Sequence, residues 1–128
     1  MSVEQILGSA EPILIAAGGA TEGPLWHQGG YLTYVRHREN MLMRLDLGGE
    51  AKPVRHDTGG GNGCTLDRQG RLVMCEGANR QITRMDAEGL VATIADRWQG
   101  KRLNRPNDIV CRSDGGIYFT DPEGTVPQ

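Results

Sequence analysis

The sequence predicts an all-β protein assembled from repeated four-stranded units, and three observations support this fold class. First, the chain contains 19 glycines among 128 residues, and they separate short apolar runs. Such punctuation is typical of strands joined by turns. Second, no stretch keeps a 3.6-residue apolar period over more than two turns, which argues against amphipathic helices. Third, similar residues recur about 40 positions apart, which indicates an internal repeat.

The repeat is clearest at three polar residues that each precede a glycine by eight positions. These pairs are Glu22 and Gly30, Asn62 and Gly70, and Asn107 and Gly115. The first two pairs lie 40 residues apart and the next two 45. A repeat of this length is typical of the four-stranded blade of a β-propeller, in which equivalent positions of successive blades face one central channel. The sequence therefore predicts that these three side chains point to a shared place.

The strands of each unit can be placed from the apolar runs between turns. After a polar or helical lead over residues 1–11, we expect an isolated strand at 13–16. The first unit has expected strands near 22–26, 31–36, 41–46 and 52–56, and the second near 63–67, 71–75, 80–85 and 90–95. A longer connection over 96–105 leads to a third pair of strands near 107–111 and 116–120.

Two blades and part of a third do not close a ring, because propellers typically contain four to eight blades. We therefore expect an incomplete propeller domain over 12–128, with blades near 22–57 and 62–96 and a partial blade at 106–128. We interpret the chain as a truncated form, and the strand at 13–16 as the outer strand of a final blade that it lacks. Open blade edges are prone to self-association.

Charge and hydropathy exclude several function classes. A net charge of −2 and an isoelectric point near 5.9 give no basic surface for nucleic acid or an anionic membrane. No run approaches the ~18 apolar residues of a membrane span. Residues 1–7 lack the basic start of a secretory signal, so the predicted location is the cytoplasm.

Neither the cysteines nor the histidines have the spacing of a metal site. The cysteines are odd in number and widely separated, which predicts buried free thiols, and the histidines are predicted to lie at the surface. These residues are Cys64, Cys75, Cys111, His27, His37 and His56. The glycine-rich run 59–63 lacks the Lys-Ser/Thr of a phosphate loop, and we interpret it as an inter-blade turn that delivers Asn62 to the channel.

Two segments carry the candidate functional residues. Glu22 opens the first inner strand beside a Gly-Pro pair, where glycine allows a ligand to approach closely. Arg105 and Asn107 flank Pro106, whose ring fixes the backbone, and being two residues apart they can project from the same side. Their guanidinium and carboxamide groups suit hydroxyls and carbonyl or carboxylate oxygens. For Asp108 we favour a simpler role, a side-chain bond to the backbone of a turn.

These segments together give the chain a family resemblance that covers it from about residue 12 onward. The resemblance rests on Thr21–Trp26, Asn62-Gly63, Leu66–Leu72, Cys75-Glu76, Asn79-Arg80, Asn104–Asp108 and Ile117–Pro122. In this order they are similar to the motifs of bacterial gluconolactonases, within the senescence-marker-protein/gluconolactonase family of six-bladed propellers.

The resemblance implies a lactonase, that is, a carboxylic ester hydrolase of carbohydrate metabolism that opens a small sugar lactone. It also implies one divalent cation in the channel, with Ca²⁺ preferred over Mg²⁺, Zn²⁺ or Mn²⁺. Glu22 matches the family's first metal-ligand glutamate, and Arg105 and Asn107 match its substrate-contacting arginine and asparagine. Asn62 lines the channel by register alone. No catalytic residue is identified in this portion, since the general base is expected in blades that the chain lacks.

Two alternatives from other classes remain open at this point. One is a non-catalytic propeller that serves as an interaction scaffold, in which the channel residues have no coupled function. The other is an inactive fragment of a lactonase.

Overall fold

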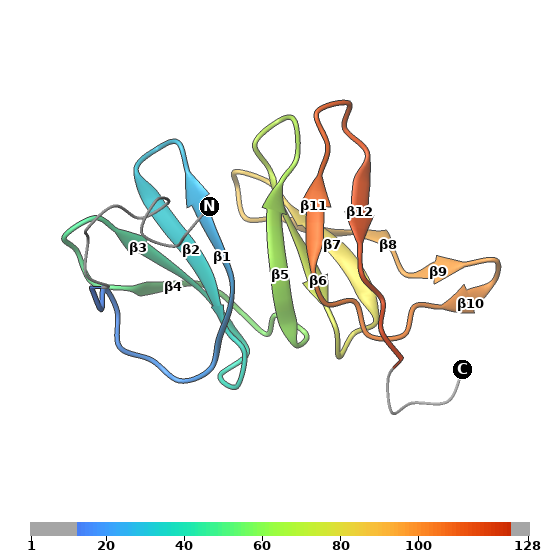
Figure 1. The fold of residues 1–128 in the computed structure, drawn as a ribbon, viewed down its shortest axis with the longest axis horizontal. Helices are drawn as coiled ribbons and strands as arrows, with labels where there is room; N and C mark the ends of the chain where they lie inside the picture. Colours follow the sequence, from blue (N-terminus) through green and yellow to red (C-terminus); the bar gives the residue numbers. More distant parts are fainter. Residues whose placement is uncertain (1–12, 124–128) are drawn as a thin grey trace, which may run out of the picture.

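The computed structural model describes residues 13–123, and every regular element in that range is a strand. The lead predicted for residues 1–11 lies outside the described residues. Two four-stranded antiparallel sheets follow one another along the chain, and a two-stranded sheet and a short hairpin complete the described part (Figure 1). Within residues 13–123 there is no helix long and apolar enough to cross a bilayer.

Both large sheets have the same construction, with consecutive strands paired in chain order. The first sheet contains β1 (Thr21–His27), β2 (Tyr31–Arg36), β3 (Met41–Asp46) and β4 (Lys52–His56). The second sheet contains β5 (Gly61–Leu66), β6 (Leu72–Glu76), β7 (Gln81–Met85) and β8 (Val91–Ala95). The third, two-stranded sheet pairs β11 (Ile109–Cys111) with β12 (Ile117–Phe119). The predicted fold class, an all-β partial propeller of four-stranded units, is confirmed, and the ends of these strands differ from the prediction by no more than two residues.

The predicted repeat register is confirmed by the turn after each inner strand. Gly30, Gly70 and Gly115 all adopt a positive φ, of 83°, 75° and 95°. In each turn the glycine N–H donates to the carbonyl three residues earlier, at 2.9 or 3.0 Å. Because this left-handed conformation is costly for residues with a Cβ, the eight-residue spacing reflects the same turn made three times.

The core lies between the successive sheets, and β6 shows how it is filled. All five residues of β6 are buried, because alternate side chains of a strand point to opposite faces. Leu72 and Met74 pack with Val35 and Leu42 of the first sheet. Val73 and Cys75 face the other way, into a cluster with Leu103, Ile109, Ile117 and Phe119. The second sheet is therefore covered on both faces.

Two sequence predictions of secondary structure are wrong. Residues 13–16 do not form a strand, because no described strand lies beside them to share backbone hydrogen bonds, and Ile13 and Leu14 are 82% and 83% exposed. Conversely, the connection predicted at 96–105 contains a hairpin of β9 (Arg97–Trp98) and β10 (Lys101–Arg102). Its turn uses Gln99 and Gly100, both at positive φ.

The prediction of surface histidines is wrong for His27 and holds for His56, which is exposed. The His27 ring is buried, lies 2.8 Å from the Thr33 hydroxyl through Nε2, and stacks on the Tyr31 ring at 4.2 Å. Burial, and then the Arg44 charge, lower the pKa of His27. His27 is the last residue of β1 and pairs with β2. Its burial depends on that neighbouring strand, so the sequence around His27 indicated only a turn.

The cysteines are free, as predicted, and burial is complete only for Cys75. Cys64 and Cys111 are half-buried. Burial raises the pKa of Cys64 and of Cys75 to about 12 each, so both thiols stay protonated and are poor nucleophiles at neutral pH.

A buried carboxylate joins the first two sheets. Glu76, at the end of β6, is fully buried and accepts a hydrogen bond of 2.6 Å from Arg55 Nη2 of β4. It also accepts bonds of 2.8 Å from Asn79, Gln81 and Thr83. Burial alone would raise the pKa of Glu76, but these four hydrogen bonds outweigh it and hold the pKa below its usual range. The charged form is thus satisfied inside the protein, as a buried charge requires.

We expect Arg55→Met to lower the free energy of unfolding by about 3 kcal/mol, because it leaves the Glu76 charge buried without its cationic partner. Urea denaturation followed by circular dichroism measures this change. The matched control is Arg112→Met, which removes an arginine from a solvent-exposed pair with Asp114 and should cost under about 1 kcal/mol. Equal losses in the two variants would contradict the role given to Glu76.

Candidate functional site

Glu22 and Asn62 occupy the same place in two successive sheets. Each is the second residue of its inner strand, β1 or β5. In both strands the pairing register shifts around this place, between Glu22 and Leu25 in β1 and between Gly61 and Cys64 in β5. A bulge of this kind bends the strand and re-aims the side chains beside it. Glu22 is exposed and Asn62 half-buried.

Glycines next to these residues bring the inner strands into backbone contact. Gly23 has a φ of 52°, and a Cβ added there would overlap the Asn62 carbonyl oxygen. One sheet further on, Gly63 donates its N–H to the Asn107 carbonyl oxygen at 2.7 Å, and an added Cβ would lie 2.7 Å from that same oxygen. Only glycine permits so close an approach.

The contacts run in order from β1 to β5 to β11, and Figure 1 shows these three strands side by side. The structure therefore brings together the backbones at Glu22, Asn62 and Asn107, each beside the next. The sequence assigned these three residues to one register, and the glycine contacts give that register a physical basis.

Asn107 and Arg105 are held by the start of the third sheet. The Asn107 N–H donates to the Thr120 carbonyl at 3.0 Å, and the Arg105 N–H donates to Asp121 Oδ1 at 2.8 Å. Pro106 between them is buried, while Arg105 and Asn107 are exposed. Arg105 lies against Gly77, where an added Cβ would be 3.2 Å from its Cγ. It therefore borders the β6–β7 turn rather than the contact between β1 and β5.

The segment that delivers Asn62 is fixed by an asparagine of the first sheet. Asn40, at a φ of 56°, accepts hydrogen bonds through Oδ1 from the Thr58 hydroxyl at 2.9 Å and from the Gly60 N–H at 3.0 Å. This confirms that the glycine-rich run works as a turn between sheets. Asp108 likewise has the simpler role expected for it, since its Oδ1 accepts the Ile109 N–H at 2.9 Å.

The candidate side chains themselves are left available. Among residues 13–123, no partner forms a hydrogen bond or ion pair with the side chains of Glu22, Asn62, Arg105 or Asn107. Their backbones, by contrast, are held in sheet ladders and turns. The polar groups of these side chains therefore remain available to a ligand, while the backbone beneath them is held in place.

The side-chain oxygen atoms at this place are of the type that binds a hard cation, but few residues supply them. Glu22, Asn62 and Asn107 offer oxygen atoms, the ligands that Ca²⁺ and Mg²⁺ prefer. Glu22 is the single carboxylate among the three. In the part of the chain that the structure describes, no group of three or more His, Cys, Asp or Glu side chains gathers where a metal could be held.

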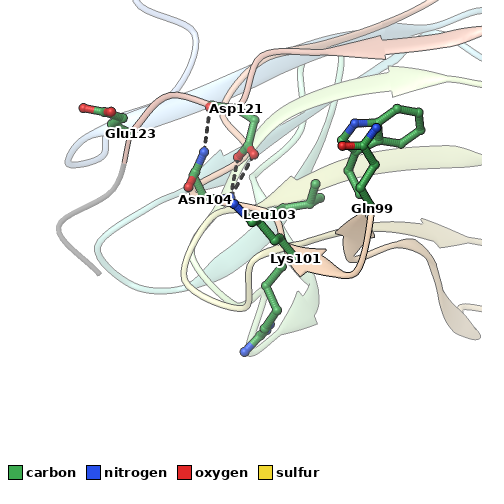
Figure 2. A pocket seen from close by; sticks show the side chains of 8 residues that line it. Gln99, Lys101, Leu103, Asn104, Asp121 and Glu123 are labelled. Atoms are coloured by element: carbon green, nitrogen blue, oxygen red, sulfur yellow. Dashed lines mark hydrogen bonds between the residues drawn. The ribbon is translucent and has the colours of Figure 1, made fainter. Parts of the chain in front are cut away.

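Sequence reasoning missed Asp121, which organises the segment before Asn107. Its carboxylate accepts the Asn104 N–H at 2.8 and 2.9 Å as well as that of Arg105, as Figure 2 shows for Asn104. An Asp-Pro pair at the end of a strand is a recognisable signal for such a cap. Its partner sixteen residues earlier in the chain could not be inferred from the sequence alone.

A cavity of about 440 Å³ adjoins this segment. It lies between the β9–β10 hairpin and residues 121–123, and Figure 2 shows Gln99 and Lys101 on one side and Asn104, Asp121 and Glu123 on the other. Arg105, the next residue after Asn104, is bound to the same Asp121 carboxylate. One residue of the cavity lining, Asn104, therefore directly precedes Arg105 in the chain.

The sheets and the register of the inner strands define a β-propeller-type protein, and comparisons with known proteins place it further. The family described as SMP-30/gluconolactonase/LRE-like region matches residues 20–127. The chain belongs to this family, and the resemblance seen in the sequence is confirmed.

Two relatives are called gluconolactonases. One, from Zymomonas mobilis, is 27% identical, and the match covers 94% of this chain and 38% of the relative. A solved gluconolactonase structure from Xanthomonas campestris is 37% identical, with a TM-score of 0.78 over 82% of this chain and 36% of that one. The chain thus spans well under half the length of these relatives.

A more distant likeness concerns the fold alone. Virginiamycin B lyase from Staphylococcus aureus is 20% identical, with a TM-score of 0.64, and the match covers 79% of this chain and 34% of that one.

We expect Gly23→Ala to cost about 3 kcal/mol of unfolding free energy, because it combines a left-handed φ with overlap on the Asn62 carbonyl. Gly30→Ala is the matched control, since Gly30 has a positive φ of 83° and nothing within 4 Å of an added Cβ. It should cost about 1 kcal/mol. Urea denaturation of both variants tests the contact, which a Gly23→Ala cost no larger than that of Gly30→Ala would refute.

Proposed function

We propose that this chain contributes to a lactonase that hydrolyses a sugar lactone at the end of the inner strands where Glu22, Asn62 and Asn107 lie. The observation that supports it most is the repeated backbone contact at Gly23 and Gly63, which brings together the backbones that carry these polar side chains. Membership of the SMP-30/gluconolactonase/LRE-like family and the similarity to proteins called gluconolactonases support the choice of reaction.

Substrate contact is assigned to Arg105 and Asn107. The Asn107 carboxamide offers both a donor and an acceptor to sugar hydroxyls. The Arg105 guanidinium offers N–H donors in a fixed fork. Placed at the lactone carbonyl, it would stabilise the negative charge that develops on oxygen as water attacks. Asp121 supports both roles, because it fixes the Arg105 backbone two residues before Asn107.

Glu22 is the residue of this chain that would hold a divalent cation, for which we propose Ca²⁺ ahead of Mg²⁺, Zn²⁺ or Mn²⁺. A cation at this place would supply Lewis-acid polarisation of the lactone carbonyl. Glu22 is exposed, and among the described residues its carboxylate has no other partner. A carboxylate without a competing arginine or lysine is free to act as a ligand. One carboxylate predicts weak affinity.

The three free cysteines support the cytoplasm as the proposed location, since disulfides are rare in that compartment. Fractionation of cells that express the chain tests this proposal, and recovery from a secreted fraction would oppose it.

The experiment on the reaction measures gluconolactone hydrolysis by the purified chain and by a version extended to the length of its relatives, corrected for the spontaneous rate, with and without chelator; the variants are made in the extended version. Arg105→Met should lower kcat/KM by about 100-fold, as expected for the loss of an oxyanion partner. Glu22→Gln should abolish the effect of the chelator, since it removes the proposed ligand. The matched control, Arg112→Met, changes an exposed turn arginine and should leave the rate unchanged.

Two results would contradict the proposal. A rate no higher than the spontaneous one, both in the chain and in a version extended to the length of its relatives, would reject the reaction. Unchanged kinetics in Glu22→Gln and Asn107→Ala would favour a non-catalytic scaffold instead.

A second proposal concerns self-association, in which the first sheet of one copy packs against the β11–β12 sheet of another. Trp26 and Leu47 are 52% and 73% exposed beside the first sheet, and Val110 and Tyr118 are 58% and 56% exposed on the third. This contact would repeat the stacking that already joins successive sheets within the chain. Its two surfaces differ, so the assembly would be head-to-tail.

We expect sedimentation velocity to show a concentration-dependent shift to larger species, and Tyr118→Lys to abolish it. Glu88→Lys is the control, because Glu88 lies in an exposed turn and is not among the apolar residues proposed for the contact. A monomer at every concentration, or equal assembly in both variants, would refute the contact.

A further inference from the structure

A pocket that the proposed chemistry leaves unused lies beside the β9–β10 hairpin. This is the cavity of about 440 Å³ shown in Figure 2. Its lining includes Leu103, which is 6% exposed, and Trp98, which is 73% exposed. Gln99, Lys101, Asn104 and Glu123 supply polar groups around them.

The hairpin holds its pocket residues in place without a ligand. Gln99 and Gly100 form a two-residue turn with φ values of 48° and 81°, which are the values of a type I′ hairpin. Trp98 is paired directly with Lys101 across the ribbon. A turn of this type matches the natural twist of the two strands, so the indole and the ammonium group start from a defined backbone.

Two arginines fix the hairpin to the second sheet. Arg102 Nη2 donates to the Asn79 carbonyl at 2.7 Å, and Arg80 Nε donates to the Leu103 carbonyl at 2.6 Å. Asn79 is itself bound to the buried Glu76 carboxylate at 2.8 Å. The base of the hairpin is therefore tied to the core, which leaves the Trp98 end exposed on a stable support.

The chemistry of the lining matches a sugar ring. A pyranose presents an apolar face of C–H groups with hydroxyls around its edge. An exposed indole offers a flat apolar surface of large area, and the amide, ammonium and carboxylate groups beside it can bond hydroxyls in both directions. Pockets for small molecules generally combine such an apolar surface with a few polar groups.

The position of the pocket links it to the proposed lactone site. Asn104 lines the pocket, and Arg105, the adjacent residue, is assigned to the lactone. Consecutive Cα atoms are only about 3.8 Å apart. Both N–H groups bind the same Asp121 carboxylate, at 2.8 to 2.9 Å. A molecule bound at Arg105 can therefore extend past Asn104 into the pocket that Trp98 lines.

We propose that this pocket binds the second sugar ring of a disaccharide lactone or of its aldonate product, with Trp98 stacked on the ring face and Lys101 bonded to its hydroxyls. The proposal rests on the proposed function, because it takes Arg105 and Asn107 as the contacts of the first ring. It narrows the substrate class from sugar lactones in general to glycosylated ones.

The test measures binding rather than hydrolysis. The chain has two tryptophans, so Trp26→Phe leaves Trp98 as the sole indole fluorophore. This variant is titrated with lactobionate, a disaccharide aldonate, and separately with gluconate, the open-chain aldonate that lacks the second sugar. We expect lactobionate to change Trp98 emission saturably, with a Kd about tenfold lower than that of gluconate. Adding Lys101→Ala should weaken lactobionate binding about fivefold.

Either of two outcomes overturns the proposal: no saturable change with lactobionate in a variant whose circular dichroism is unaltered, or equal Kd values for the two ligands. The proposed function fails separately, in the gluconolactone assay. Lactobionate binding without hydrolysis would support the sugar pocket and reject the reaction, while hydrolysis without selective binding would do the reverse.

Discussion

The buried Glu76 carboxylate is the interaction on which the rest of the described structure depends. It receives Arg55 from the first sheet, Gln81 and Thr83 from its own sheet, and Asn79 from the turn between. Through the Asn79 carbonyl the same cluster extends to the hairpin that precedes the third sheet. A charge in the interior is tolerated only when it is fully bonded. Its burial therefore ties the first sheet to the second and, through Asn79, the second sheet to the hairpin.

The inner strands obey a second constraint, which is steric. Gly23 and Gly63 let one backbone touch the next, and the residues beside these contacts are the candidate ligands of the site. The position of Glu22, Asn62 and Asn107 is thus a property of the main chain. Their side chains do not hold the fold together, since none forms a hydrogen bond or ion pair with another residue among 13–123.

Much of the fold could be predicted from sequence, because its signals are local. Turn glycines at 30, 70 and 115 need a left-handed φ, and alternation within strands such as β6 follows from the pleat. The roles of Glu76 and Asp121 could not be predicted, since their partners lie up to 21 residues away in the chain. The hairpin at 97–102 was missed because its strands have two residues each and carry charges. The strand predicted at residues 13–16 is wrong for the opposite reason. An apolar run forms a strand only where a neighbouring strand can pair with it.

The paired bulges in β1 and β5 have a consequence for how such a site can change. Both sheets make the same backbone kink at the same place, yet one carries a carboxylate there and the other an amide. The kink therefore does not depend on which side chain stands at this position, and different residues can occupy it. Charge could therefore be added to or removed from this end of the inner strands by single substitutions, which would alter the chemistry of the candidate site while the backbone stays the same.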